Sequence, residues 1–159
     1  MTQSDQQGRP RDPSERVGTG TARTKARKRA LDLLFAAEAR GLGAGDLLDQ
    51  QIAEGEAPTN PYTVTLVRGV VEHREQIDEI VGEHATDWTL DRMPAVDRNV
   101  LRLATWELLY AEDVPAGVVL SEATLLVGDL STDESPTFVN GVLAAIDREH
   151  SDAPGGRTD

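Results

Sequence analysis

Apolar residues recur at three- and four-residue spacings along most of the chain, which is the periodicity of an α-helix. Leu31, Leu34 and Phe35 form the first apolar stripe, in a helix that we expect over residues 21–40. A weaker helix is expected over residues 44–54. Because no segment shows a sustained two-residue alternation, we expect no β-sheet. The pattern therefore predicts an all-α fold.

Two motifs in which a capping residue precedes proline mark further helix starts. Asn60-Pro61 opens a helix expected over residues 61–84, and Ser135-Pro136 opens the last one, over residues 136–150. The segment 94–112 is apolar on most of its circumference, which is typical of a helix at the centre of a bundle. The remaining expected elements are a short helical turn at residues 90–93 and a helix over residues 115–128.

Both ends of the chain are polar and rich in Gly, Pro or Ser. Residues 1–20 and 151–159 cannot bury enough apolar surface to offset their ordering entropy, so we expect disordered tails around one domain, residues 21–150. The absence of Cys excludes disulfides and thiolate metal sites. No segment is long and apolar enough for a transmembrane helix or a signal peptide. We therefore expect a cytoplasmic protein with no membrane partner.

Charge is distributed unevenly along the chain, whose formal net charge is −12. Residues 1–29 hold eight Lys/Arg and three Asp/Glu, a net of +5, whereas residues 30–159 hold eight Lys/Arg and 25 Asp/Glu, a net of −17. A positive end on an acidic body is typical of a localised site for a polyanion. The acidic body would repel nucleic acid elsewhere.

Five cations lie within seven residues of the first helix: Arg23, Lys25, Arg27, Lys28 and Arg29. At 100° per residue, Lys25, Lys28 and Arg29 fall outside the arc of the apolar stripe. Arg27 lies in line with Leu31 but one turn earlier, where we expect the helix to project past the core. These groups could then contact phosphates together, Arg through its planar fork. The alternative is a basic helix end that is merely solvated.

Three stretches resemble the NusB family, its actinobacterial members in particular. They are residues 22–35 (ARTKARKRALDLLF), residues 96–108 (VDRNVLRLATWEL), and residues 113–123 (DVPAGVVLSEA) followed by residues 138–143 (FVNGVL). The resemblance spans about residues 22–150. It implies about seven helices in two small packed bundles, and a role as an RNA-binding transcription antitermination factor.

The resemblance also implies partners and contact residues. The partners are the single-stranded boxA element of nascent ribosomal RNA, the small-subunit ribosomal protein NusE, and the RNA polymerase elongation complex with other Nus factors. Glu134 and Phe138 join the five cations as expected RNA contacts, and Phe35, Ala39 and Asp97 are placed on the side that faces NusE. A homodimer through the same surface is an open alternative.

Each of these assignments has a plainer structural alternative. Phe138 and Phe35 could be core side chains, and Glu134 and Asp97 could be acids that favour a helix N-terminus. Asn140-Gly141 lies inside the last helix, where glycine is costly, so we expect another helix to approach closely there.

Catalysis finds no support in the sequence. His73, His84 and His150 are few and scattered, no third metal ligand follows at useful spacing, and no Glu-x-x-His motif is present. We therefore predict no catalytic residues, no metal site and no cofactor. Two alternatives to the RNA-binding function stay open: a protein-binding scaffold with little RNA affinity, favoured by the acidic body, and a helical enzyme.

Overall fold

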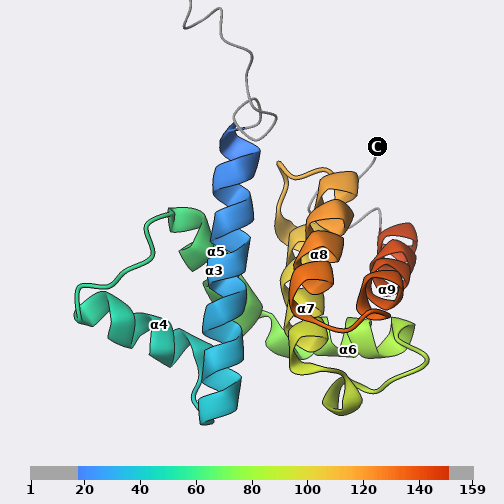
Figure 1. The fold of residues 1–159 in the computed structure, drawn as a ribbon, viewed down its shortest axis with the longest axis horizontal. Coiled ribbons are helices and arrows are strands. Elements are labelled where there is room, and N and C mark those ends of the chain that lie inside the picture. The colour runs from blue at the N-terminus through green and yellow to red at the C-terminus, as the bar shows by residue number, and fades with distance from the viewer. Residues whose placement is uncertain (1–17, 151–159) are drawn as a thin grey trace, which may run out of the picture.

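The computed structural model describes residues 18–150, which form seven α-helices, one short 3-10 helix and no strand (Figure 1). The all-α prediction is confirmed. The elements are α3 (Gly18–Arg40), α4 (Ala44–Ala53), α5 (Pro61–Glu72), α6 (Arg74–His84), η1 (Leu90–Arg92), α7 (Ala95–Tyr110), α8 (Ala116–Leu130) and α9 (Ser135–Glu149).

The expected disordered tails fall almost wholly outside the described residues, which exclude 1–17 and 151–159. The one difference concerns residues 18–20, which belong to α3. This helix begins at Gly18, whereas the expected start was residue 21. Within the described segment, none of the helices combines the length and apolar character needed to cross a bilayer.

The helices form two bundles, as the resemblance implied. Helices α3, α4 and α5 contact one another on one side of the molecule, and α6, α7, α8 and α9 form the other side (Figure 1). Helix α7 also contacts α3 and α5, so it joins the two bundles. Eleven of its 16 residues are buried, which confirms the prediction of a central helix.

The helix expected over residues 61–84 is divided in two. Asn60 caps its start as predicted, since its side chain accepts a hydrogen bond from the Tyr62 N–H at 2.8 Å. However, α5 ends at Glu72 and α6 begins at Arg74, with His73 at φ −113° and ψ 21° between them. The His73 ring stacks on Tyr110 of α7 at 4.1 Å. The break lets α5 stay in the first bundle while α6 enters the second. This requirement comes from the tertiary structure, and no Gly or Pro at the break indicates it in the sequence.

An ion-pair network joins the end of α3 to α7 and α6. Glu38 accepts hydrogen bonds from Arg98 and from Asn99, the latter at 3.0 Å. Arg102 lies 3.5 Å from the same carboxylate and donates to Asp78 at 2.8 Å. The network therefore spans the boundary between the bundles with matched charges.

Stability should depend on the ionisation of Glu38. Partial burial opposes its ionisation, but hydrogen bonds from Arg98 and Asn99 and the charges of Arg98 and Arg102 outweigh burial and lower its pKa. The unfolded chain then takes up this proton first as pH falls, so the contribution is complete above about pH 4.3 and is lost on acidification. We expect Glu38→Gln to flatten the acid limb of a plot of unfolding free energy against pH.

The matched control for this prediction is Glu83→Gln, which removes an exposed carboxylate that no described residue contacts in an ion pair. Urea unfolding between pH 3 and pH 7 measures both variants. Equal slopes for wild type and Glu38→Gln below about pH 4.3 would contradict the role given to Glu38.

Candidate nucleic-acid interface

The cations of α3 border a hollow between α3 and α5. Lys25 and Lys28 are exposed and Arg29 is half-buried. Lys25 and Arg29 line a hollow of about 360 Å³ together with Thr59, Asn60, Thr63 and Ala26. Two cations beside hydroxyl and amide groups form a surface that can bind an anion such as a phosphate.

Side-chain to backbone hydrogen bonds build this hollow. The Asn60 Nδ2 donates to the Ala22 carbonyl at 3.2 Å, and the Thr63 hydroxyl donates to the Ala26 carbonyl at 2.9 Å. These bonds hold the first turn of α5 against α3. The sequence pointed to Asn60 only as a helix cap, so the contribution of this loop to the hollow was missed.

The three cations on this face, Lys25, Lys28 and Arg29, differ in the partners that they already have within the protein. Within the described part of the chain, Lys25 has no ion pair, and Lys28 has only a 3.6 Å contact with Asp32 one turn away. Arg29 donates to the Gln51 side chain at 2.7 Å, a neutral partner. Because exposed pairs are weak, most of the positive charge of these residues remains available.

Arg23 is more constrained. Its guanidinium lies 4.0 Å from the centroid of the Tyr62 ring and 3.1 Å from the Asp113 carboxylate. A phosphate would have to displace Asp113, so Arg23 is a weaker candidate than Lys25.

The expectation that Arg27 reaches solvent is wrong. Arg27 is only 4% exposed. Its guanidinium donates two hydrogen bonds of 2.9 Å to Glu107 and one of 3.2 Å to Glu122. The Tyr62 hydroxyl donates to the same Glu107 carboxylate at 2.5 Å. Helix α3 does not project past the core at this turn, because α5, α7 and α8 cover it.

The electrostatics of this cluster fix its protonation. Burial opposes the charge of Arg27, but hydrogen bonds to Glu107 and the charges of Glu107 and Glu122 outweigh burial and raise its pKa. Burial, followed by the Glu107 charge and hydrogen bond, raises the pKa of Tyr62. Arg27 therefore stays a cation and Tyr62 a neutral phenol at physiological pH, and Arg27 is a structural group.

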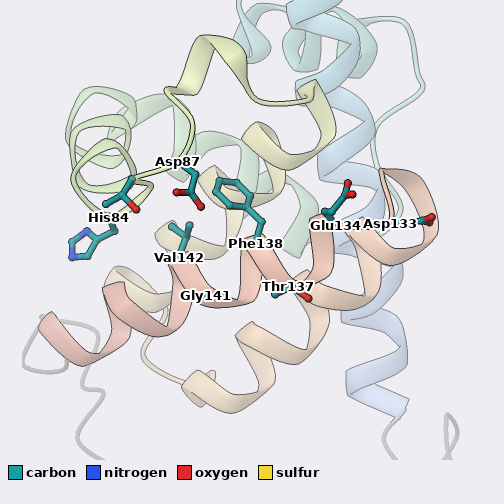
Figure 2. A pocket seen from close by; sticks show the side chains of 9 residues that line it. His84, Asp87, Asp133, Glu134, Thr137, Phe138, Gly141 and Val142 are labelled. Carbon is teal, nitrogen blue, oxygen red and sulfur yellow. The ribbon is translucent and has the colours of Figure 1, made fainter.

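A second hollow, of about 620 Å³, lies beside the start of α9 (Figure 2). Phe138 lines it while also packing on the core, and its ring meets Trp88 edge-on at 5.1 Å. Glu134 lies at the N-cap position of α9, exposed and without a capping hydrogen bond. Phe138 thus combines the two expected roles geometrically: it anchors α9 and presents ring surface to the hollow.

This second hollow is acidic. Asp87, Asp133 and Glu134 line it, and no Lys or Arg is among its lining residues. It would repel phosphates, so any RNA contact here would involve bases rather than backbone. The RNA contacts expected at Glu134 and Phe138 stay a prediction.

The expected partner residues separate into two groups. Phe35 is 43% exposed and Ala39, one turn further along α3, is also exposed, so the core alternative for Phe35 is wrong. Leu42 adds a further exposed apolar side chain just after the helix. The three define an exposed apolar strip at the C-terminal end of α3, away from Lys25.

Asp97 does not lie on this strip, and the expectation that it contacts a partner is wrong. It is fully buried and accepts hydrogen bonds from the hydroxyls of Ser131 at 2.6 Å and Ser135 at 2.8 Å. Ser135 consequently does not cap α9: its hydroxyl is turned inward and Glu134 occupies the cap position. Asp97 positions the loop that leads into α9.

Two further expectations are corrected by the packing. His84 and His150 are not scattered: their ring centroids lie 5.8 Å apart, and Glu149 lies beside them. Gly141 is exposed with no atom close to a Cβ at that position, whereas the close approach of a side chain occurs at Gly69, against Trp106.

The fold and the α3 face together define a small two-bundle helical domain with a cationic surface suited to a polyanion. Comparison with known proteins identifies its family. The model of the NusB family matches residues 24–148, and the chain belongs to that family.

Individual relatives agree with this assignment. The chain is 66% identical over 128 residues to the transcription antitermination protein NusB of a Nocardioides species, covering 80% of this chain and 95% of the relative. The structure of T. maritima NusB superposes with a TM-score of 0.74 at 33% identity, covering 85% of this chain and 95% of that one. A chain in a complex of NusB and NusE with double-stranded RNA superposes with a TM-score of 0.69 at 32% identity, covering 80% and 96%.

Proposed function

We propose that this chain is an RNA-binding transcription antitermination factor that acts by adhesion and catalyses no reaction. It would hold the boxA element of nascent ribosomal RNA together with a NusE ribosomal protein, on the RNA polymerase elongation complex with other Nus factors, in the cytoplasm. The observation that carries the proposal is the α3 hollow, which Lys25 and Arg29 line together, neither of them paired with a carboxylate among residues 18–150. The similar chain found in a NusB–NusE–RNA complex supports it.

The proposed RNA contact is electrostatic. Lys25, Lys28 and Arg29 would neutralise phosphates of an extended strand that follows α3, and the acidic remainder of the protein would keep the strand on that path. Phe138 would offer ring surface for a base further along. This arrangement excludes Arg27 from direct contact because its donors are occupied.

The exposed strip of Phe35, Ala39 and Leu42 is the proposed surface for the NusE partner. Apolar side chains on, or just after, the helix that carries the cations would place protein and RNA on adjacent parts of one surface, so that each partner helps to bind the other. A homodimer through this strip is the competing occupant, and molar mass in solution with and without NusE distinguishes the two.

The test is simultaneous replacement of Lys25, Lys28 and Arg29 by Ala. If each contacts one phosphate, the slope of log affinity against log salt should fall in magnitude by about 2 for single-stranded boxA RNA. Fluorescence anisotropy over a salt series, with NusE present, measures this slope.

The matched control removes three exposed arginines elsewhere: Arg68, Arg92 and Arg148. It changes the net charge by the same amount and should leave the slope close to that of wild type. Equal slopes for both triple variants would show that overall charge, not the α3 face, governs binding.

A protein-binding scaffold is the second candidate. It is favoured by the burial of Arg27, the pairing of Arg23 with Asp113 and the acidity of the hollow beside Phe138. A titration of boxA RNA with NusE alone and with the two proteins together discriminates: the scaffold function predicts that adding this chain changes the RNA affinity only through its effect on NusE, with no dependence on Lys25.

A further inference from the structure

A cluster of potential metal ligands lies where the end of α6 meets the end of α9, in the bundle opposite the α3 cations. His84 is the last residue of α6, Glu149 is the last residue of α9, and His150 directly follows α9. One imidazole nitrogen from each histidine and a carboxylate oxygen of Glu149 all lie within 4.8 Å of one another.

The hydrogen bonding of His84 orients one nitrogen toward this cluster. Its Nδ1 lies 2.8 Å from the Ile80 carbonyl oxygen, which can only accept, so Nδ1 carries a proton. Its Nε2 faces the Glu149 carboxylate, with which it is in close contact. A metal ion bound between the two groups would accept a lone pair from each.

His150 provides an independent observation. Its Nε2 is buried and has no hydrogen-bond partner within the described segment. Buried polar atoms without a partner are rare in folded proteins because they lose their hydration and receive nothing in exchange. Since His150 belongs to the three-residue cluster, an ion bound there through this nitrogen would satisfy it.

We propose that His84, Glu149 and His150 bind one divalent transition-metal ion, with zinc the best match. Two imidazole nitrogens and one carboxylate oxygen are a donor set that zinc accepts in tetrahedral geometry, with the fourth position open to water. The His84 Nδ1–H bond to a backbone carbonyl is the orienting interaction usually found behind such ligands. The set contains no thiolate and too few oxygens for calcium or magnesium.

The dimensions fit with a small adjustment. Zinc binds these ligands at about 2.0–2.2 Å, so tetrahedral ligand atoms lie roughly 3.4 Å apart. The Glu149 side chain is 65% exposed and can shift until its oxygen reaches this spacing from both histidines. His84 also lines the acidic hollow, and Figure 2 shows it toward the same end as Asp87, whose charge favours a cation.

A bound ion would connect α6 to α9, because two of its ligands come from one helix end and one from the other. Metal binding should therefore stabilise the second bundle. The proposal assigns a binding site and no reaction, and it is independent of RNA binding by α3.

Zinc titration of the untagged full-length chain tests the proposal, with isothermal calorimetry for stoichiometry and thermal unfolding for stability. We expect one zinc ion per chain, release of protons on binding, and a higher Tm in the presence of zinc. Single variants Glu149→Gln and His150→Gln should each weaken the affinity by at least about tenfold. Magnesium at the same concentration should leave the Tm unchanged.

The matched control is His73→Gln, which removes the one other histidine of the chain. It should bind zinc as wild type does. Imidazole nitrogen shifts in NMR spectra, recorded with and without zinc, report on the ligands directly. Zinc affinity that is absent in wild type, unchanged in Glu149→Gln, or reduced equally in His73→Gln would overturn the proposal. Because Glu149 is exposed, its substitution tests the site without depending on a core side chain.

Discussion

Replacing Arg27 by Ala is expected to lower the free energy of unfolding by about 3–5 kcal/mol. The guanidinium is buried with Glu107, whose side chain is 3% exposed, and it also donates to Glu122. Removing the cation takes the Arg27 charge away from the Glu107 carboxylate, whose side chain is almost fully buried. The Tyr62 hydroxyl would still donate a hydrogen bond to this carboxylate but would not neutralise its charge. Urea unfolding followed by circular dichroism measures the loss.

Two further variants determine whether this loss comes from the ion pair. Lys28→Ala removes a neighbouring but exposed cation of α3, and its effect should stay within about 0.5 kcal/mol. The double variant Arg27→Met with Glu107→Met should lose much less than the sum of its single substitutions, because no charge is left buried alone. Additive losses would show that the two side chains act independently.

This prediction also separates the two roles of the basic segment. Arg27 ties α3 to α7 and α8, and so holds the helix that carries Lys25, Lys28 and Arg29. If Arg27→Ala binds RNA more weakly, the weaker binding should therefore be accompanied by a lower free energy of unfolding. The triple variant of the exposed cations should lose RNA affinity at unchanged stability.

Replacing Gly69 by Ala is the second large effect that we expect, a loss of about 1–3 kcal/mol. Gly69 lies buried in α5, and an added Cβ would lie only 2.3 Å from the indole of Trp106. The ring cannot simply turn aside, since it packs on the core and lies 6.2 Å from Tyr110. The clash outweighs the gain of about 1 kcal/mol that alanine ordinarily brings to a helix interior.

The control for Gly69 is Gly82→Ala in α6, where an added Cβ meets nothing within 4 Å. That substitution should raise stability by roughly 0.4–1 kcal/mol. In a Trp106→Leu background the obstructing ring is absent, and Gly69→Ala should become neutral or stabilising. A loss from Gly69→Ala that persists in this background would point to a cause other than the indole.

Local pattern was sufficient for most of the fold. The spacing of Leu31 and Leu34 placed α3, the Asn60-Pro61 motif placed the start of α5, and the nearly uniform apolar surface of α7 placed it at the centre. Such features depend on residues within one or two turns of each other, so they are present in the sequence. The break at His73 was missed because the packing that accompanies it, which includes the stacking of His73 on Tyr110, involves another helix.

Tertiary structure alone decided which candidate site residues are buried and which partners they have. Helical spacing placed Arg27 in line with Leu31, but its burial depends on Glu107 and Glu122, 80 and 95 residues away. Which histidines meet depends equally on how α6 and α9 pack. Sequence periodicity determined that this protein is a helical bundle with a basic first helix. Only the packing of distant segments determined which charges remain exposed, because burial depends on what covers a side chain rather than on the direction in which it leaves its helix.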